Sequence, residues 1–138
     1  METTAAPTLV PDVPAYVYAL QKIDITEKQK EMLRIHYASP CRITTARDLA
    51  QSVGFPDYGA ANLQYGLLGS KVADALGIGF RGVSMLVVMA RPGTATNTEW
   101  IWVLRENVVL ALEELGWVEK STHLFYPQGP YEETFESE

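Results

Sequence analysis

Hydrophobic positions between residues 26 and 76 recur at helical spacing and predict three consecutive helices. The first is predicted over Thr26–Tyr37, because Thr26 and Gln29 have the spacing of a capping box. A short second helix is predicted over Thr45–Val53, where Thr44 or Thr45 provides the N-cap. A third, longer helix is predicted from about Tyr58 to Leu76.

The third predicted helix is rich in leucine and contains two interior glycines. Its expected core stripe consists of Leu63, Leu67, Leu68, Val72 and Leu76. Gly66 and Gly69 each cost about 1 kcal/mol relative to alanine inside a helix. We therefore expect either a closely packed backbone or a bend at these positions.

The pattern changes to strand-like segments after the third helix. Val83–Ala90 is an apolar, β-branched run, 91–98 has turn residues, and Glu99–Leu104 alternates. Together these segments predict a β-hairpin. Glu106–Leu115 predicts a last amphipathic helix. Two further short strands are expected, at Ala15–Leu20 and starting at 117–118.

This order of elements predicts an α+β fold that is mainly helical. A short capped helix, a glycine-bearing turn, a longer helix and a β-hairpin are typical of a winged helix-turn-helix core, followed here by a C-terminal helix. We expect a flexible arm over residues 1–14, one globular domain over 15–126 and an acidic tail over 127–138.

The distribution of charge keeps nucleic acid among the expected ligands. The chain has a net charge of −6, which by itself disfavours binding to phosphates. Residues 26–81, however, carry seven basic and five acidic side chains, a balance of +2, whereas residues 82–138 carry three and nine. A positive contact face on the helical core is therefore compatible with the acidic total.

No pattern of catalytic, cofactor-binding or metal-ligating residues stands out. Cys41 is the single cysteine, and it has no adjacent base to activate its thiol. His36 and His123 do not have the spacing of zinc ligands. No apolar run reaches the length of a membrane span, and one cysteine without a signal peptide is typical of a cytoplasmic protein. We therefore expect no enzyme activity, no cofactor and no membrane partner.

The residues expected to contact double-stranded DNA lie at the start of the third helix and around the loop before the second. Asn and Gln side chains read adenine edges, and arginines and hydroxyls hold phosphates. A basic residue at the tip of the hairpin is a further backbone contact. For His36, a structural position near a helix C-terminus is about as favoured as a contact with DNA. For Tyr37, a place in the core is about as favoured as a contact with DNA. The expected set is His36, Tyr37, Arg42, Thr45, Arg47, Asn62, Gln64 and Arg91.

Three short motifs in residues 20–86 carry a family resemblance. They are His36-Tyr37-x-x-Pro40, Thr45-Ala46, and Tyr58-x-Ala60-x-Asn62 leading into Tyr65-Gly66-x-x-Gly69. This stretch resembles the sulfur-binding domain found ahead of HNH nuclease domains in modification-dependent restriction proteins. The resemblance implies a bacterial protein of a restriction system that reads phosphorothioate-modified DNA.

The same resemblance implies a shallow pocket of rings and aliphatic groups around the sulfur. On this chain the pocket residues would be His36, Pro40, Tyr58, Ala60 and Tyr65. No nuclease segment is recognisable in the 138 residues, so a nuclease domain or subunit is the expected partner. The alternative is a protein-interaction module, in which the acidic C-terminal half of the chain binds a basic partner.

Overall fold

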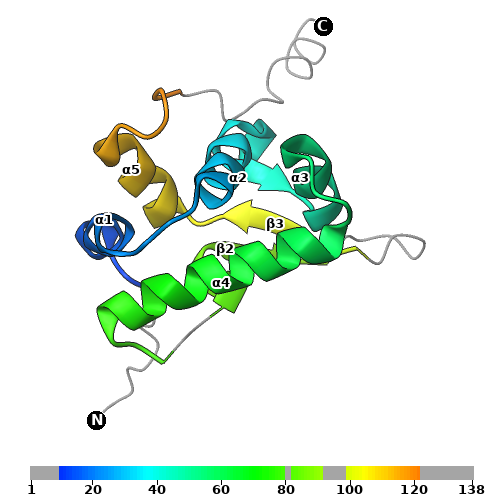
Figure 1. Cartoon of the computed structure of the whole chain (residues 1–138). Coiled ribbons are helices and arrows are strands. Elements are labelled where there is room, and N and C mark those ends of the chain that lie inside the picture. Colours follow the sequence, from blue (N-terminus) through cyan, green and yellow to red (C-terminus); the bar gives the residue numbers. More distant parts are fainter. Residues whose placement is uncertain (1–9, 80–81, 92–98, 122–138) are drawn as a thin grey trace, which may run out of the picture.

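The computed structural model describes residues 10–79, 82–91 and 99–121, and all structural statements here refer to these residues. They form five helices and three strands (Figure 1). The elements are α1 (Val13–Lys22), α2 (Glu27–Ala38), β1 (Ile43–Thr44), α3 (Ala46–Val53), α4 (Tyr58–Leu76), β2 (Val87–Ala90), β3 (Ile101–Leu104) and α5 (Glu106–Leu115), with short 3₁₀ turns η2 (Pro40–Arg42) and η3 (Gly82–Met85).

The three strands form one antiparallel sheet in the order β1-β3-β2. The chain therefore runs helix α2, strand β1, helices α3 and α4, and then the β2–β3 pair, which is the element order of a winged helix-turn-helix core. The predicted mainly helical α+β fold is confirmed. Both hairpin strands are shorter than expected. Residues 82–85 form a 3₁₀ turn before the first strand, and the second strand begins only at Ile101.

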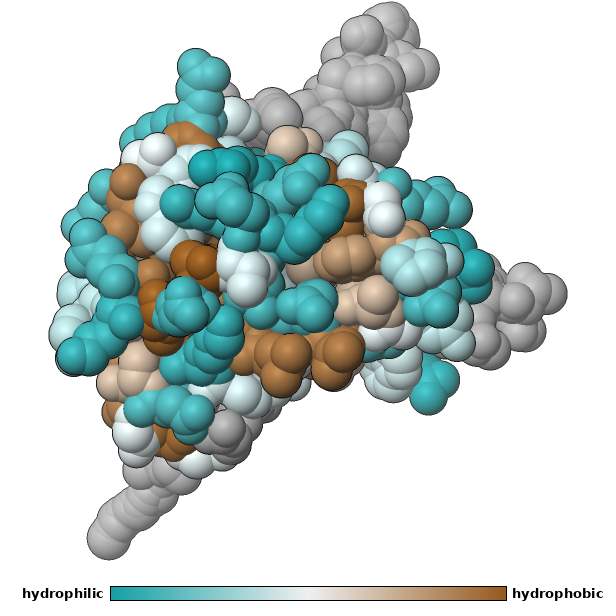
Figure 2. All heavy atoms as spheres, viewed as in Figure 1, coloured by the Kyte–Doolittle hydropathy of each residue, from teal (hydrophilic) through white to brown (hydrophobic). Residues whose placement is uncertain are grey.

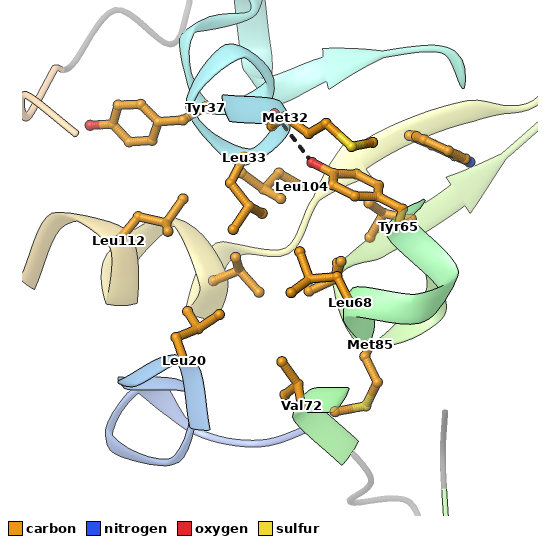
Figure 3. Packing of buried hydrophobic residues seen from close by; sticks show 14 of the residues in the cluster. Leu20, Met32, Leu33, Tyr37, Tyr65, Leu68, Val72, Met85, Leu104 and Leu112 are labelled. Carbon is orange, nitrogen blue, oxygen red and sulfur yellow. Dashed lines mark hydrogen bonds between the residues drawn. The ribbon is translucent and has the colours of Figure 1, made fainter. Parts of the chain in front are cut away.

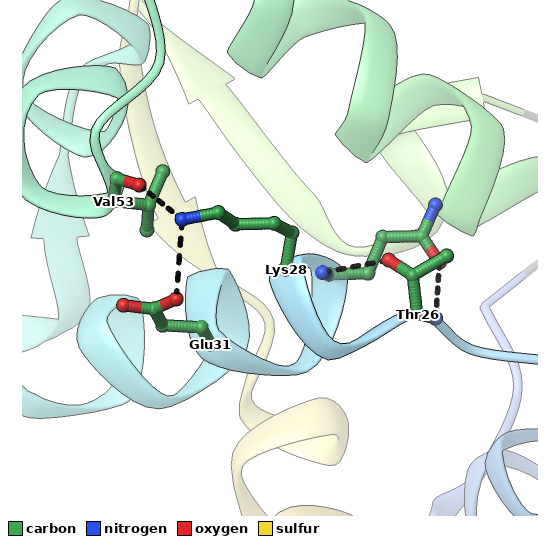
Figure 4. A network of polar contacts seen from close by, with 5 residues as sticks. Thr26, Lys28, Glu31 and Val53 are labelled. Atoms are coloured by element: carbon green, nitrogen blue, oxygen red, sulfur yellow. Dashed lines mark hydrogen bonds and ion pairs between the residues drawn. The ribbon is translucent and has the colours of Figure 1, made fainter.

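Side-chain caps fix where the predicted helices begin. Thr26 and Gln29 make the expected capping box, Thr45 accepts from the Asp48 amide, and Asp57 accepts from the Ala60 amide. Lys28 then joins two helices, since its Nζ donates to the carbonyl of Val53 at 2.6 Å and pairs with Glu31 (Figure 4). A cation at the C-terminal end of α3 also complements the helix dipole.

One hydrophobic core joins all five helices to the sheet. Leu20 of α1, Leu33 of α2, Leu68 of α4 and Leu112 of α5 converge in its centre (Figure 3). Aromatic rings extend the core under the strands, because Tyr65 stacks on Trp102 with 5.3 Å between ring centroids. The sheet and α4 are thus held in one packing unit.

The strands expected at 15–20 and from 117 are wrong. Residues 13–22 form α1, which Asp12 caps and Pro14 enters at its first turn, so the helix also begins within the expected arm. Its Tyr16, Ala19 and Leu20 are buried, which is helical rather than alternating spacing. Residues 117 and 118 follow the left-handed Gly116 without forming a strand. Residues 1–9 of the expected arm and the whole expected tail, 127–138, lie outside the described residues.

The buried side of α4 also differs from the expected stripe. Leu68 and Val72 are buried as predicted, but Leu63 and Leu67 are 57% and 46% exposed. Tyr65, not a leucine, occupies the centre of the buried side. The prediction from leucine spacing failed here because the buried side of α4 also contains small and aromatic residues, which a search for large aliphatic residues does not select. They are Ala61, Tyr65, Gly69 and Ala73.

The packing of α4 explains why position 69, one of its two interior glycines, has no side chain. A Cβ atom at Gly69 would collide with the carbonyl oxygen of Gly82, so the helix packs directly against the backbone of η3. Gly66 has open space instead, with no heavy atom within 4 Å of an added Cβ. The expected close backbone approach is therefore confirmed at Gly69 only.

These two glycines predict opposite effects of the same substitution. Gly69→Ala should lower the free energy of unfolding by about 1–3 kcal/mol, because η3 must move away from α4. Gly66→Ala should raise it by about 0.5–1 kcal/mol, because alanine favours the helix and meets nothing. Urea titrations of both variants test this, and equal effects at the two positions would contradict the packing described.

Candidate nucleic-acid interface

A surface pocket of about 320 Å³ lies where the first turns of α3 and α4 meet the β2–β3 pair. Asp57 caps α4 at this end, so the first turn of the helix presents Tyr58 and Asn62 to the pocket. The lining combines a guanidinium, an amide, a thioether and three aromatic rings: Ala46, Arg47, Tyr58, Asn62, Met89, Glu99, Trp100 and Trp102.

Arg47 is the cation of this pocket. Its Nε lies 3.6 Å from a carboxylate oxygen of Glu99, and its guanidinium lies 5.6 Å from the centre of the Tyr58 ring. The Arg47 side chain remains 58% exposed, so the ion pair contributes little to stability. The pair instead sets the charge of the pocket, because an anion entering it meets a cation already paired with a carboxylate.

Four side chains outside the predicted site residues complete the pocket from the hairpin side: Met89, Glu99, Trp100 and Trp102. Trp100 is exposed, and the guanidinium of Arg91 lies 4.5 Å from the centre of its ring. Met89 faces Trp102 in the strand register and points to the same side of the sheet. Strand alternation indicates that Trp100 and Trp102 share a face, but only the fold buries one and exposes the other.

His36 is a core residue and not a surface contact. Its side chain is fully buried, with Nε2 3.0 Å from the carbonyl oxygen of Trp102 and Nδ1 2.9 Å from the hydroxyl of Tyr65. Since a carbonyl only accepts, Nε2 carries the proton and Nδ1 accepts from Tyr65. Burial lowers the pKa of His36 to about 4 and raises that of Tyr65 well above its usual range.

Tyr37 and Arg42 also belong to the structural framework. The Tyr37 hydroxyl donates to Glu113 at 2.6 Å and accepts from the Ser121 amide. Arg42 is 9% exposed, donates to the carbonyls of Tyr37 and Ser121, and stacks on the Tyr37 ring at 4.0 Å. The structure does not place Arg42 as the expected phosphate contact, because its guanidinium is buried and binds the carbonyls of Tyr37 and Ser121.

The remaining predicted residues fall into two groups. Arg47, Tyr58 and Asn62 line the pocket. Thr45 caps α3, and the Gln64 side chain accepts from Gln29 of α2 at 3.1 Å. Pro40 is exposed and Ala60 half-buried, and neither lines the pocket.

The five-residue sulfur pocket expected from the resemblance does not form as one surface. His36 and Tyr65 are fully buried beneath the sheet, and only Tyr58 of the five lines the pocket near the hairpin. A short motif with a histidine and a tyrosine does not reveal whether these side chains face solvent or the core. Only the packing of α2 against β3 distinguishes the two.

Comparisons with models of protein families, with curated proteins and with solved structures found no match. Among the described residues, no three His, Cys, Asp or Glu side chains are placed to hold a metal ion. None of the helices in the described ranges is long and apolar enough to cross a membrane. The pocket itself therefore carries the functional argument.

The buried His36 predicts loss of stability in mild acid. The unfolded chain protonates this histidine near its ordinary pKa of 6.5, whereas the folded chain does so only near 4. Between these values the unfolded state binds more protons, so stability falls as pH falls, by up to about 1.4 kcal/mol per pH unit. Thermal melts from pH 7 to 4.5 should show this slope reduced in His36→Gln and retained in His123→Gln. Equal slopes in both variants would contradict the assignment.

Proposed function

We propose that this chain is a DNA-reading domain that holds a modified backbone group, a phosphorothioate, in the pocket between α4 and the β2–β3 pair. The observation that carries the proposal is the composition of that pocket. One guanidinium and one amide, Arg47 and Asn62, stand beside Tyr58, Trp100 and the thioether of Met89. In a helix-turn-helix protein the first turn of the second helix of the pair is the part that approaches base edges.

The chemistry of the lining suits sulfur better than oxygen. Replacing a phosphate oxygen with sulfur makes one point of the backbone larger, more polarisable and less hydrated. Ring edges and a thioether give such an atom dispersion contacts and require little desolvation. A plain phosphate oxygen gains less from Met89 and Trp100 and loses its water, so the apolar part of the pocket favours the modified backbone.

The charge of the pocket supports the same preference. Arg47 attracts the phosphate, while Glu99 beside it reduces the net attraction. A second cation, Arg91, lies next to Trp100 and supports a contact with the DNA backbone. A site with few cations gains little affinity from counterion release, so discrimination has to come from the modified group.

The proposed partners follow from this reading role. Double-stranded DNA is the ligand, and a nuclease domain or subunit of a restriction system would act on the DNA that the domain binds. We propose no catalysis by this chain itself. The proposed location is the bacterial cytoplasm, which contains the DNA and keeps thiols such as that of the single cysteine reduced.

The exposed side of α4 favours a second function, a protein-interaction module. Leu63 and Leu67 project from this helix into solvent, and Figure 2 shows hydrophobic surface along it. The Nζ of Lys71, the only Lys or Arg on α4, lies 2.5 Å from the carbonyl of Asp24. An apolar helix face is more typical of contacts with protein than with phosphate. Binding of DNA, and its dependence on salt, discriminates the two functions.

Fluorescence titrations with matched duplexes, plain and phosphorothioate-modified, test the first function. We expect the modified duplex to bind more tightly at two salt concentrations. Tyr58→Ala should reduce the preference for the modified duplex roughly tenfold, because a ring contact is worth about 1–3 kcal/mol. Tyr18→Ala is the matched control, since Tyr18 and Tyr58 are 50% and 52% exposed and Tyr18 lies on α1. No binding to either duplex at low salt would reject the proposal and favour a protein partner.

The Arg47–Glu99 pair generates a separate prediction about selectivity. Glu99→Gln should strengthen binding of the plain duplex roughly three- to fivefold, because the neutral amide no longer opposes the phosphate beside Arg47. The modified duplex should gain less, so the preference for it should narrow. Glu114→Gln on α5 makes the same change in net charge on an exposed residue and should leave both affinities unchanged. Equal gains in the two variants would assign the effect to net charge alone.

A further inference from the structure

The two faces of the sheet are used differently. Thr44, Met89 and Trp102 are paired in register and lie on the face that meets α4 and the pocket described above. Their neighbours on the opposite face also pair in register, since both Ile43 and Val88 lie opposite Val103. These three β-branched side chains form a continuous apolar row across all three strands.

This apolar row lies in the open. Ile43 and Val88, on the two edge strands, are 41% and 46% exposed, so the apolar row is open at both ends. Beside the row, the described residues form a groove of about 570 Å³ whose other wall comes from Val109 and Leu110 of α5. The groove is mostly apolar, so covering it would release ordered water and stabilise the fold.

The described chain ends at the rim of this groove. Lys120 and Ser121 are part of its lining, and the Ser121 carbonyl and amide are held by Arg42 and Tyr37. The sequence continues with Thr122-His123-Leu124-Phe125-Tyr126. At about 3.3–3.6 Å per residue, three consecutive large apolar side chains are within reach of the groove from Ser121.

Charge is also complementary between the groove and the sequence that follows it. Basic residues Arg42, Arg105 and Lys120 line the groove together with Glu106 and Glu113. Residues 122–138 contain four glutamates and neither lysine nor arginine. With three basic and two acidic side chains the lining has a net charge of +1, which weakly attracts an acidic segment that leaves Ser121.

We propose that Leu124, Phe125 and Tyr126 dock in the groove on the outer face of the sheet. The chain then covers its own apolar row, with the acidic residues that follow held on the side of the sheet opposite the Tyr58–Trp100 pocket. This docking would keep the negative charge of the C-terminal segment away from that pocket. The proposal concerns folding and surface coverage, so it stands whether or not the chain binds DNA.

The single cysteine of the chain is a native probe of this docking. Cys41 is half-buried and lines the groove, so a docked segment should shield its thiol from a soluble disulfide reagent. The experiment compares the rate of thiol modification in the full chain, in the double variant L124S/F125S, and in the control Y131S/F135S. We expect several-fold faster modification in L124S/F125S and the wild-type rate in the control.

Amide chemical shifts of the same full-length proteins provide a second readout. Docking predicts that L124S/F125S shifts the amide signals of Val88, Val103 and Leu110 and leaves that of Leu49 in the core unchanged. Unchanged thiol rates together with unchanged signals at Val88 and Val103 would overturn the proposal. A wild-type thiol rate that falls as protein concentration rises would also overturn it, because a second copy of the chain would then cover the groove.

Discussion

The structure depends on one buried polar cluster, in which the neutral imidazole of His36 joins three elements. Its Nε2 donates to the backbone of β3 at Trp102, its Nδ1 accepts from Tyr65 of α4, and its own backbone belongs to α2. A leucine in its place would fill the space but would leave the Trp102 carbonyl and the Tyr65 hydroxyl without these partners. The cluster ties α4 to β3, and the pocket at Tyr58, Asn62 and Trp100 lies between the start of the same helix and the hairpin.

The alternation of side chains in a three-stranded sheet then divides the molecule into two surfaces. The face with Trp102 is stacked on Tyr65 and extends to Met89 at the pocket, whereas the face with Val103 carries the open apolar row. A shift of one residue in the register of β3 would exchange the two faces completely. The register therefore decides which chemistry meets a ligand and which remains to be covered.

The proposed reading of DNA has to be reconciled with an acidic chain, and the composition of the pocket bears on that. Its Arg47 is paired with Glu99, so the site has a cation without a strongly positive field. Much of its lining is ring and thioether, which favours a large and weakly hydrated atom over an ordinary phosphate oxygen. A site based on bulk positive charge would bind any duplex, whereas this composition is the reason why we propose selectivity for a modified group.

The sequence by itself determined most of the helices, their caps and the winged helix-turn-helix order, because capping residues, glycines and hydrophobic spacing act within a few positions of one another. It also indicated Arg47, Tyr58 and Asn62 as site residues, because they lie near the predicted N-terminal ends of α3 and α4. Only the tertiary structure decided that His36, Tyr37, Arg42 and Tyr65 are internal, that Leu63 and Leu67 are exposed, and that Met89, Glu99 and Trp100 complete the pocket. The physical reason is that burial of a polar or aromatic side chain depends on contacts across more than 25 residues of sequence, such as the one between His36 and Trp102. No local pattern records those contacts.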